Sequence, residues 1–384
     1  MLPKNISLRL QFSFKRKGRL FMAMHYSRNK VNRVLTLYKL AKLTEQEAWE
    51  IFRQGRFGDK EKFACPECGA IEKHWYINTR KQWHCKHCNH RFSVTSGTAF
   101  HNRKLSFSKL LWILFAFNTG LQGANANELP SDLGVTYKTA YLNFAKIREV
   151  IFETMDMTPL SGIVHIDCMH ICGKPRRSNN RKSSDSFLVN NKLRARKDSI
   201  VPDKKTHPEP SNLKKLKNRR IILALSQLAL NDDGSYGSNR TITYVLKKET
   251  AEIILPLIKK SVAKGSIIMT DFGGAFNKIE PMLGITHFSV NHSVQYQNEL
   301  GVNNNQAESF FSRVRRGEFG TYNGILKTYL AYYAAEFAYR NDCKEIGISQ
   351  RFYSLLTKVL NREPSKAFCG YNQGKRLGFE YCYS

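Results

Sequence analysis

Two close pairs of cysteines form the strongest chemical pattern in the sequence. Each pair has the spacing Cys-x-x-Cys, and the four residues are Cys65, Cys68, Cys85 and Cys88. A Cys-x-x-Cys turn presents two thiolates to one metal ion, and zinc takes four such ligands in a tetrahedral arrangement. We therefore expect these thiolates to hold a structural zinc ion in a ribbon of small hairpins. Nearby histidines are alternative ligands, namely His84, His87 and His90.

Two acidic residues in the second half of the chain fall in apolar, strand-like runs. Asp167 lies within residues 162–171, and Asp271 ends the run 266–271. A carboxylate in such a place is costly unless it is paired or coordinates a metal ion. Two carboxylates on neighbouring strands can hold a pair of Mg²⁺ or Mn²⁺ ions, which activate an attacking oxygen and stabilise a leaving one. The alternative is that each aspartate only caps a strand end or a turn.

A third ligand for these ions is expected from a helix that begins near residue 304. Asn305, Glu308 and Arg315 recur at a spacing that places them on one face of this helix. A carboxylate is a stronger ligand for Mg²⁺ than an amide oxygen, so the chemistry favours Glu308 over Asn305. Arg315, two turns further on, would hold a phosphate. Alternatively, Asn305 and Glu308 are only a helix cap and its partner.

The segments that must position these residues alternate between helical and strand-like patterns. Residues 31–54 have the apolar spacing of one or two short helices, and another helix is predicted over 107–117. Strands are predicted over 162–171, 220–226, 241–246, 266–271 and 287–290, with a helix over 251–262. Strands followed by a helix and a parallel return strand predict an α/β sheet flanked by helices.

A helix-turn-helix is predicted between the cysteine pairs and the first strand. Gly134 marks the turn, because glycine readily adopts the left-handed conformation required there. Thr136 would cap the second helix, which is expected to run to about residue 148. The start of that helix would offer Thr136, Tyr137 and Lys138 to a DNA groove. The alternative is an ordinary helical hairpin within a core.

The charge of the chain points to a nucleic acid as partner. Its 384 residues include 61 Lys and Arg against 31 Asp and Glu, a formal net charge of +30. Clustered cations bind phosphates by releasing counterions. Segment 174–220 is strongly basic and loop-like, and we expect it either to grip phosphates or to be a solvated surface. The further basic residues expected to contact DNA are Lys174, Arg176, Arg177, Arg313 and Arg316.

Composition excludes several other classes of protein. Hydrophobic residues make up 42% and charged residues 24% of the chain, which is typical of a globular protein rather than a disordered one. No apolar run reaches the roughly 18 residues of a membrane span, and the basic start lacks the apolar segment of a signal peptide. The nine cysteines form no scattered disulfide framework. We therefore expect a cytoplasmic protein.

In combination and order, these motifs resemble bacterial insertion-sequence transposases of the ISXO2-like group, over roughly residues 24–342. Beside the cysteine pairs and the helix-turn-helix, the motifs are Asp167…Gly173-Lys174, Thr270-Asp271-Phe272, Val290-Asn291-His292-Ser293, Asn305…Glu308, Gly320-Thr321-Tyr322 and Glu336-Phe337-Ala338-Tyr339-Arg340-Asn341. The chain departs from the group at Cys168, His170 and Arg315, where an acidic residue, an aromatic residue and lysine are common.

The resemblance implies an RNase H-like DDE transposase domain that uses a divalent metal ion, with the zinc ribbon and helix-turn-helix binding double-stranded DNA at the element ends. It leaves Asn305 and Glu308 as alternatives for the third catalytic residue. Two ends must meet, which implies a homodimer or a larger assembly. A non-catalytic DNA-binding regulator and an inactive transposase remnant are the alternative functions. In the bacterial cytoplasm, the protein would be associated with the nucleoid.

These observations predict the domain organisation of the chain. The expected parts are a basic extension (1–24), a helical N-terminal region (25–60), the zinc ribbon (61–104), the helix-turn-helix region (105–158), the RNase H-like catalytic domain (159–345) with its basic insertion (174–220), and a C-terminal tail (346–384).

Overall fold

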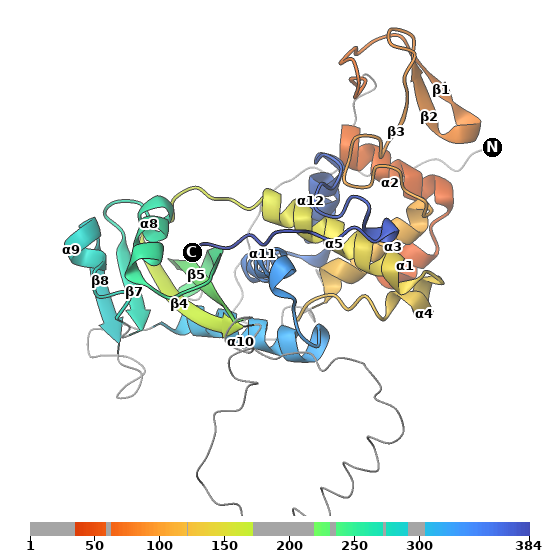
Figure 1. The fold of residues 1–384 in the computed structure, drawn as a ribbon. Coiled ribbons are helices and arrows are strands. Elements are labelled where there is room, and N and C mark those ends of the chain that lie inside the picture. Colours follow the sequence, from red (N-terminus) through yellow and green to blue (C-terminus); the bar gives the residue numbers. More distant parts are fainter. Residues whose placement is uncertain are drawn as a thin grey trace, which may run out of the picture.

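The computed structural model describes residues 35–58, 63–120, 122–171, 219–230, 236–271, 274–290 and 304–384. The basic extension and nearly all of the basic insertion lie outside these residues. Figure 1 shows a β-sheet with flanking helices at one end of the molecule and a helical region at the other. A small β-hairpin projects from the helical region. We refer to these two ends as the sheet lobe and the helical lobe.

The helical lobe begins with α1 (Leu37–Ala41) and α2 (Glu45–Phe57), which confirms the short helices predicted there. Thr44 and Glu47 form a capping box at the start of α2, in which each side chain accepts a hydrogen bond from the other residue's N–H. Beside α2 lie three antiparallel strands, β1 (His74–Ile77), β2 (Gln82–Cys85) and β3 (Arg91–Ser93). The Trp49 ring of α2 stacks on Trp83 of β2, with 6.0 Å between ring centroids, and so fixes the hairpin to the helix.

Three further helices complete the N-terminal part of this lobe, namely α3 (Phe107–Thr119), α4 (Leu129–Leu133) and α5 (Tyr137–Glu153). Gly134 ends α4 in the left-handed conformation, and the Thr136 side chain accepts the Thr139 N–H at the start of α5. The predicted turn and cap are therefore confirmed. The second helix continues beyond residue 148, because Val150 and Ile151 extend its buried apolar face.

The sheet lobe contains the predicted α/β sheet. Within the described residues, its strands are β4 (Ile163–Ile171), β5 (Arg220–Leu230), β6 (Tyr236–Leu246), β7 (Ile267–Asp271) and β8 (Thr286–Val290), in the order β6-β5-β4-β7-β8. The β4–β5 and β5–β6 pairs are antiparallel, whereas β4–β7 and β7–β8 are parallel. The strands β5 and β6 are longer than predicted, since their pairing continues beyond the predicted runs to Leu230 and Tyr236.

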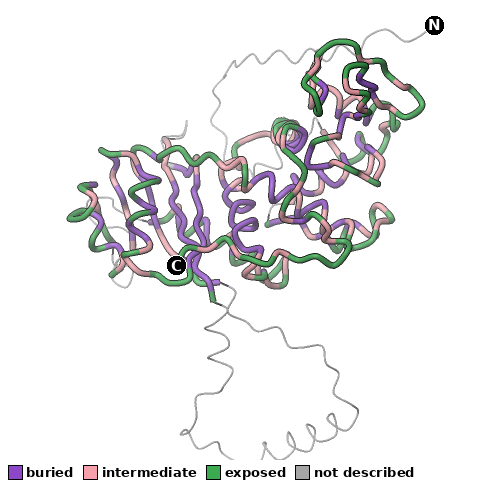
Figure 2. The backbone as a smooth tube through the Cα atoms, turned by 45° about the horizontal axis from the view of Figure 1, so that its top comes forward, coloured by how far each residue is buried: buried purple, intermediate pink, exposed green. Residues whose placement is uncertain are grey.

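Helices cover both faces of this sheet. One face packs against α8 (Ala251–Ser261), whose Ile254 and Ile258 join Ile166 in an apolar cluster. The other face packs against α10 (Asn305–Arg316) and α11 (Leu330–Asp342), where Phe310 lies in a cluster with Met169. Figure 2 shows the buried strands between exposed outer segments. Because alternate residues of a strand share a face, Asp167 lies on the α10 side with Met169.

The segment predicted to be a C-terminal tail contains a core helix. Helix α12 (Ile348–Leu360) packs against α2 and α3, and Phe352, Leu355, Leu356 and Val359 are buried there. The last residues return to the sheet lobe, where the backbone of Tyr383 exchanges hydrogen bonds with Val245 and Lys247. The apolar positions of α12 have the spacing of a helix, but its partners α2 and α3 lie in the first third of the chain.

A buried charged network joins the two lobes. Glu336 of α11 is fully buried, and its carboxylate accepts hydrogen bonds from Arg148 of α5 at 2.6 Å and from the Tyr322 hydroxyl at 2.8 Å. Arg340 also pairs with Glu336 and donates to the carbonyl of Phe117 in α3. Burial disfavours the ionised form of Glu336, but the two guanidinium groups hold its pKa below the ordinary value.

We predict that Glu336→Gln strongly destabilises the protein, because it leaves buried guanidinium charges without a counter-ion. The expected loss of unfolding free energy is about 3–5 kcal/mol. The matched control is Glu153→Gln, which breaks a partly exposed ion pair with Arg362 of 2.8 Å and should cost less than about 1 kcal/mol. Denaturant unfolding of both variants measures the difference, and equal losses would contradict this interpretation of the network.

Candidate functional site

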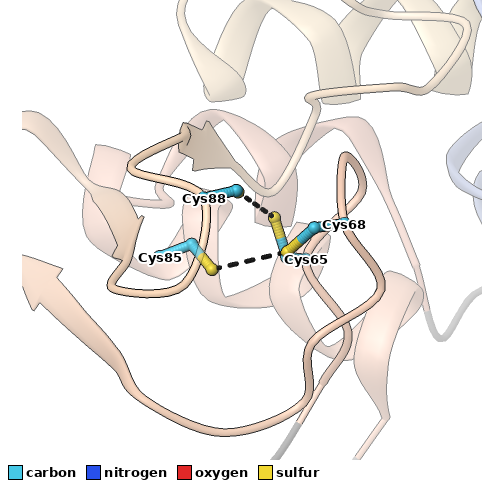
Figure 3. A group of neighbouring side chains, drawn as sticks. All are labelled: Cys65, Cys68, Cys85 and Cys88. Carbon is cyan, nitrogen blue, oxygen red and sulfur yellow. Dashed lines mark hydrogen bonds between the residues drawn. The ribbon is translucent and has the colours of Figure 1, made fainter.

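Four thiols gather at one point beside the hairpin of the helical lobe. Figure 3 shows the side chains of Cys65, Cys68, Cys85 and Cys88 together. Their sulfur atoms all lie within 4.8 Å of one another. The Sγ–Sγ distance is 3.7 Å both for Cys65–Cys88 and for Cys68–Cys85. Among the described residues, no other group of three or more Cys, His, Asp or Glu ligand atoms is gathered this closely.

Tight turns behind each cysteine pair produce this arrangement. Gly69 adopts a positive φ of 72°, and its N–H donates to the Cys65 carbonyl. Burial disfavours the Cys85 thiolate, but the N–H groups of Cys88 and His87 donate to its sulfur and lower its pKa. A tetrahedral set of four thiolates fits a structural zinc ion. None of the three alternative histidines belongs to the group.

We predict that Cys68→Ser lowers the bound zinc from one ion per chain to substantially less. Since the metal provides much of the folding free energy of such a ribbon, on the order of 10 kcal/mol, strands β1–β3 should also unfold. Metal analysis of the purified protein and the fluorescence of the buried Trp83 measure the two effects. Cys369→Ser, at an exposed thiol outside the cluster, is the control and should keep the full zinc content.

The two predicted aspartates lie side by side on neighbouring strands. The parallel register of β4 and β7 pairs Ile166 with Thr270, and the next residue on each strand is Asp167 and Asp271, respectively. Both side chains are half-buried. Glu308 lies in the first turn of α10, on the helix that covers this face of the sheet. The fold thus brings residues from three distant parts of the chain to one edge of the sheet.

The charges of these carboxylates act on one another. Burial raises the pKa of Asp167, and the negative charges of Asp271 and Glu308 raise it further, to about 6. The Cys168 N–H opposes this effect, because it donates to Asp167 Oδ1 at 2.7 Å and favours the ionised form. A cluster of mutually repelling carboxylates is a site that a cation would stabilise.

The three carboxylates are more widely spread than the four thiols. Among the described residues, their oxygen atoms do not all lie within 4.8 Å of one another. Two divalent cations about 3.5–4 Å apart require ligands arranged around both ions, rather than around a single point. The donors are all carboxylate oxygens, which suit hard cations such as Mg²⁺.

Helix α10 presents a polar face and an apolar face. Asn305, Glu308 and Arg315 share the polar face, as the spacing predicted. All three are exposed, and Arg316 is exposed as well. Arg313 differs, because it is half-buried and donates to Asn341 Oδ1 of α11 at 2.6 Å. Arg313 would have to give up its hydrogen bond with Asn341 in order to contact DNA.

The other residues predicted to bind DNA are only partly within the described structure. Thr136, Tyr137 and Lys138 are exposed at the start of α5, where the Thr136 hydroxyl also caps the helix. Lys174, Arg176 and Arg177 lie outside the described residues. The same is true of Gly173, Phe272 and the motif residues 291–293.

One acidic residue near the cluster was not predicted. Glu249 lies just beyond the end of β6, and its charge contributes to the raised pKa of Asp167. Its carboxylate lies 3.3 Å from Nε2 of His170. Because β6 runs parallel to β4 with β5 between them, both strands end at the same edge of the sheet. The sequence shows an acidic residue after a predicted strand. Only the strand order reveals that this residue lies near Asp167.

Two known protein families match the parts of the chain that contain these two groups of residues. Residues 43–91 match the transposase zinc-ribbon domain, which includes all four cysteines, and residues 159–342 match the ISXO2-like transposase domain, which includes the three carboxylates. No curated protein matches the chain significantly. Within the described residues, no helix is both long and apolar enough to cross a membrane. The chain therefore contains an ISXO2-like, DDE-type transposase domain preceded by a transposase zinc-ribbon domain.

Proposed function

We propose that this protein cleaves the DNA strands at the ends of an insertion sequence and joins them to target DNA. Asp167, Asp271 and Glu308 would be the metal ligands, with Asn305 as the alternative to Glu308. The observation that carries the proposal is the parallel register of β4 and β7, which places Asp167 beside Asp271 within the domain that matches the transposase family. Glu308 lies on the helix that covers the same face of the sheet. A pair of Mg²⁺ or Mn²⁺ ions bound there would activate the attacking oxygen and stabilise the leaving oxygen.

The side chains of the cluster have separable tasks in this reaction. The two aspartates are held on adjacent strands of a sheet, which fixes their separation. The Cys168 N–H orients the Asp167 carboxylate. Arg315 shares the exposed face of α10 with Glu308, so its guanidinium can bind the phosphate on which the reaction takes place.

We also propose that residues 159–345 form an RNase H-like domain that contains the basic insertion predicted at 174–220. Three antiparallel strands followed by two parallel strands, with helices on both faces, support this assignment. In our proposal the domain boundaries are those predicted from the sequence, except that 346–384 includes the core helix α12. Since cleavage must involve both ends of an element, the active form is a homodimer or a larger assembly.

DNA binding by α4, its turn and α5 is the second part of the proposal. Thr136, Tyr137 and Lys138 are exposed at the N-terminus of α5, which is the end that a recognition helix presents to a major groove. The zinc ribbon would make further contacts to the element ends. The net charge of +30 supports binding to the phosphate backbone in general.

We predict that Asp167→Asn and Asp271→Asn each lower metal-dependent strand cleavage at least about a hundredfold, since each removes several kcal/mol of transition-state stabilisation. Both variants should keep the affinity for DNA. The assay uses oligonucleotides that carry the element's own ends, with Mg²⁺ or Mn²⁺ present or omitted. Glu363→Gln, at an exposed acid 75% accessible to solvent, is the control. Unchanged cleavage in both aspartate variants would favour a non-catalytic regulator.

We predict that Lys138→Ala weakens binding to the element ends, because it removes one phosphate contact. The slope of log K against log salt concentration should become shallower by about 1. The control is Lys366→Ala, which removes an exposed lysine on a different part of the surface. Fluorescence anisotropy over a series of salt concentrations measures both quantities. A salt slope identical to that of the unsubstituted protein would indicate that α4 and α5 form only a helical hairpin.

A further inference from the structure

The residue just before α10 contacts both the strand of Asp167 and the helix of Glu308. Asn304 is fully buried, and its Nδ2 donates to the Ile166 carbonyl at 3.3 Å. Ile166 directly precedes Asp167 in β4. The main-chain carbonyl of Asn304 accepts the N–H of Glu308 at 3.2 Å. A single residue therefore links the backbone positions of two of the three carboxylates.

The side chain of Asn304 is not used as a helix cap. An asparagine at this position usually accepts a hydrogen bond from an N–H in the first turn of the helix. Asn304 is the N-cap residue of α10, but its side chain makes no capping hydrogen bond. The amide instead donates to the neighbouring strand. The cost of leaving the helix uncapped, typically about 1 kcal/mol, indicates that the contact with β4 has a use of its own.

We propose that Asn304 is a positioning residue, which sets the separation between Asp167 and Glu308 and thereby the affinity of the site for divalent cations. This inference rests on the proposed function, because it assumes that the two carboxylates share a metal site. Asn304 itself touches neither substrate nor metal ion in this role. Its amide sets the position of the N-terminus of α10 relative to β4.

The contact with β4 explains why an uncharged donor is suited to this position, because the Ile166 carbonyl can only accept a hydrogen bond. An aspartate at position 304 could not donate to the Ile166 carbonyl when ionised, and it would add a negative charge near the carboxylate cluster.

A second contact of the same helix turn provides a matched control. Gln306 Oε1 accepts the N–H of Ser238 in β6, at 3.3 Å. This contact fixes α10 to a strand that is separated from β4 by β5. Removing it should weaken the attachment of the helix without changing its position along β4. General loosening of α10 and a specific change in carboxylate spacing can therefore be distinguished.

The experiment compares the full-length, zinc-loaded protein with Asn304→Ala, Asn304→Asp and Gln306→Ala. Electron paramagnetic resonance measures Mn²⁺ binding, and end-cleavage assays over a range of Mn²⁺ concentrations give the concentration for half-maximal rate. Loss of a residue that orients metal ligands typically costs about 10–100-fold in metal affinity. We expect shifts of that size in both quantities for the two Asn304 variants, with recovery of the rate at high Mn²⁺. Gln306→Ala should retain the Mn²⁺ affinity of the unsubstituted protein.

Each other outcome has a definite meaning. If the unsubstituted protein is active but a folded Asn304 variant keeps the same Mn²⁺ affinity, the positioning role is wrong. The proposed function would stand in that case. Equal shifts for Asn304→Ala and Gln306→Ala would also overturn the positioning role, because they would show that only the general attachment of α10 matters. Unsubstituted protein that neither binds Mn²⁺ outside the zinc ribbon nor cleaves element ends would overturn the proposed function, and this inference with it. Asn304→Asp keeps the side-chain volume, so it tests the role even if Asn304→Ala does not fold.

Discussion

The sheet lobe must hold carboxylates together at one edge of a sheet although their negative charges repel one another. Asp167, Asp271 and Glu308 come from two strands and a helix, and their charges disfavour this arrangement in the absence of cations. Parallel pairing of β4 with β7 and the apolar packing of α10 hold the groups together nonetheless. The favourable free energy of burying the apolar face of α10 offsets the electrostatic cost. The fold therefore holds these carboxylates in place without a bound cation.

Helix α11 connects the helical lobe to the sheet lobe. Its Glu336 pairs with Arg148 of α5 and with Arg340, which in turn reaches the end of α3. The same helix packs beside α10 on the sheet. The helices that we propose to bind DNA are therefore attached through buried ion pairs to the layer that carries Glu308. Such pairs favour one relative placement, because any other would leave charges buried without partners.

The sequence alone predicted those features that depend on the type and spacing of neighbouring residues. Cysteine spacing predicted the thiol cluster, and Gly134 and Thr136 predicted the turn and the helix cap. Aspartates in apolar runs led to Asp167 and Asp271, whose catalytic role stays a prediction. Glu249 and Asn304 were not found, because their importance comes from strand order and from contacts between distant segments. Helix α12 was missed for the same reason, since the apolar period was present but its packing partners lie in α2 and α3.

The pKa of Asp167 tests most directly whether the three carboxylates form one site. Carbon-detected NMR of the zinc-loaded protein can follow the carboxyl signal through a pH titration, with Asp167→Asn used to assign it. Without added divalent cations, the account predicts a pKa of about 6, and saturation with Mg²⁺ should lower it below the ordinary value. A pKa near 3.8 that does not respond to Mg²⁺ would contradict the account, because it would mean that Asp167 neither interacts with the other carboxylates nor binds a cation.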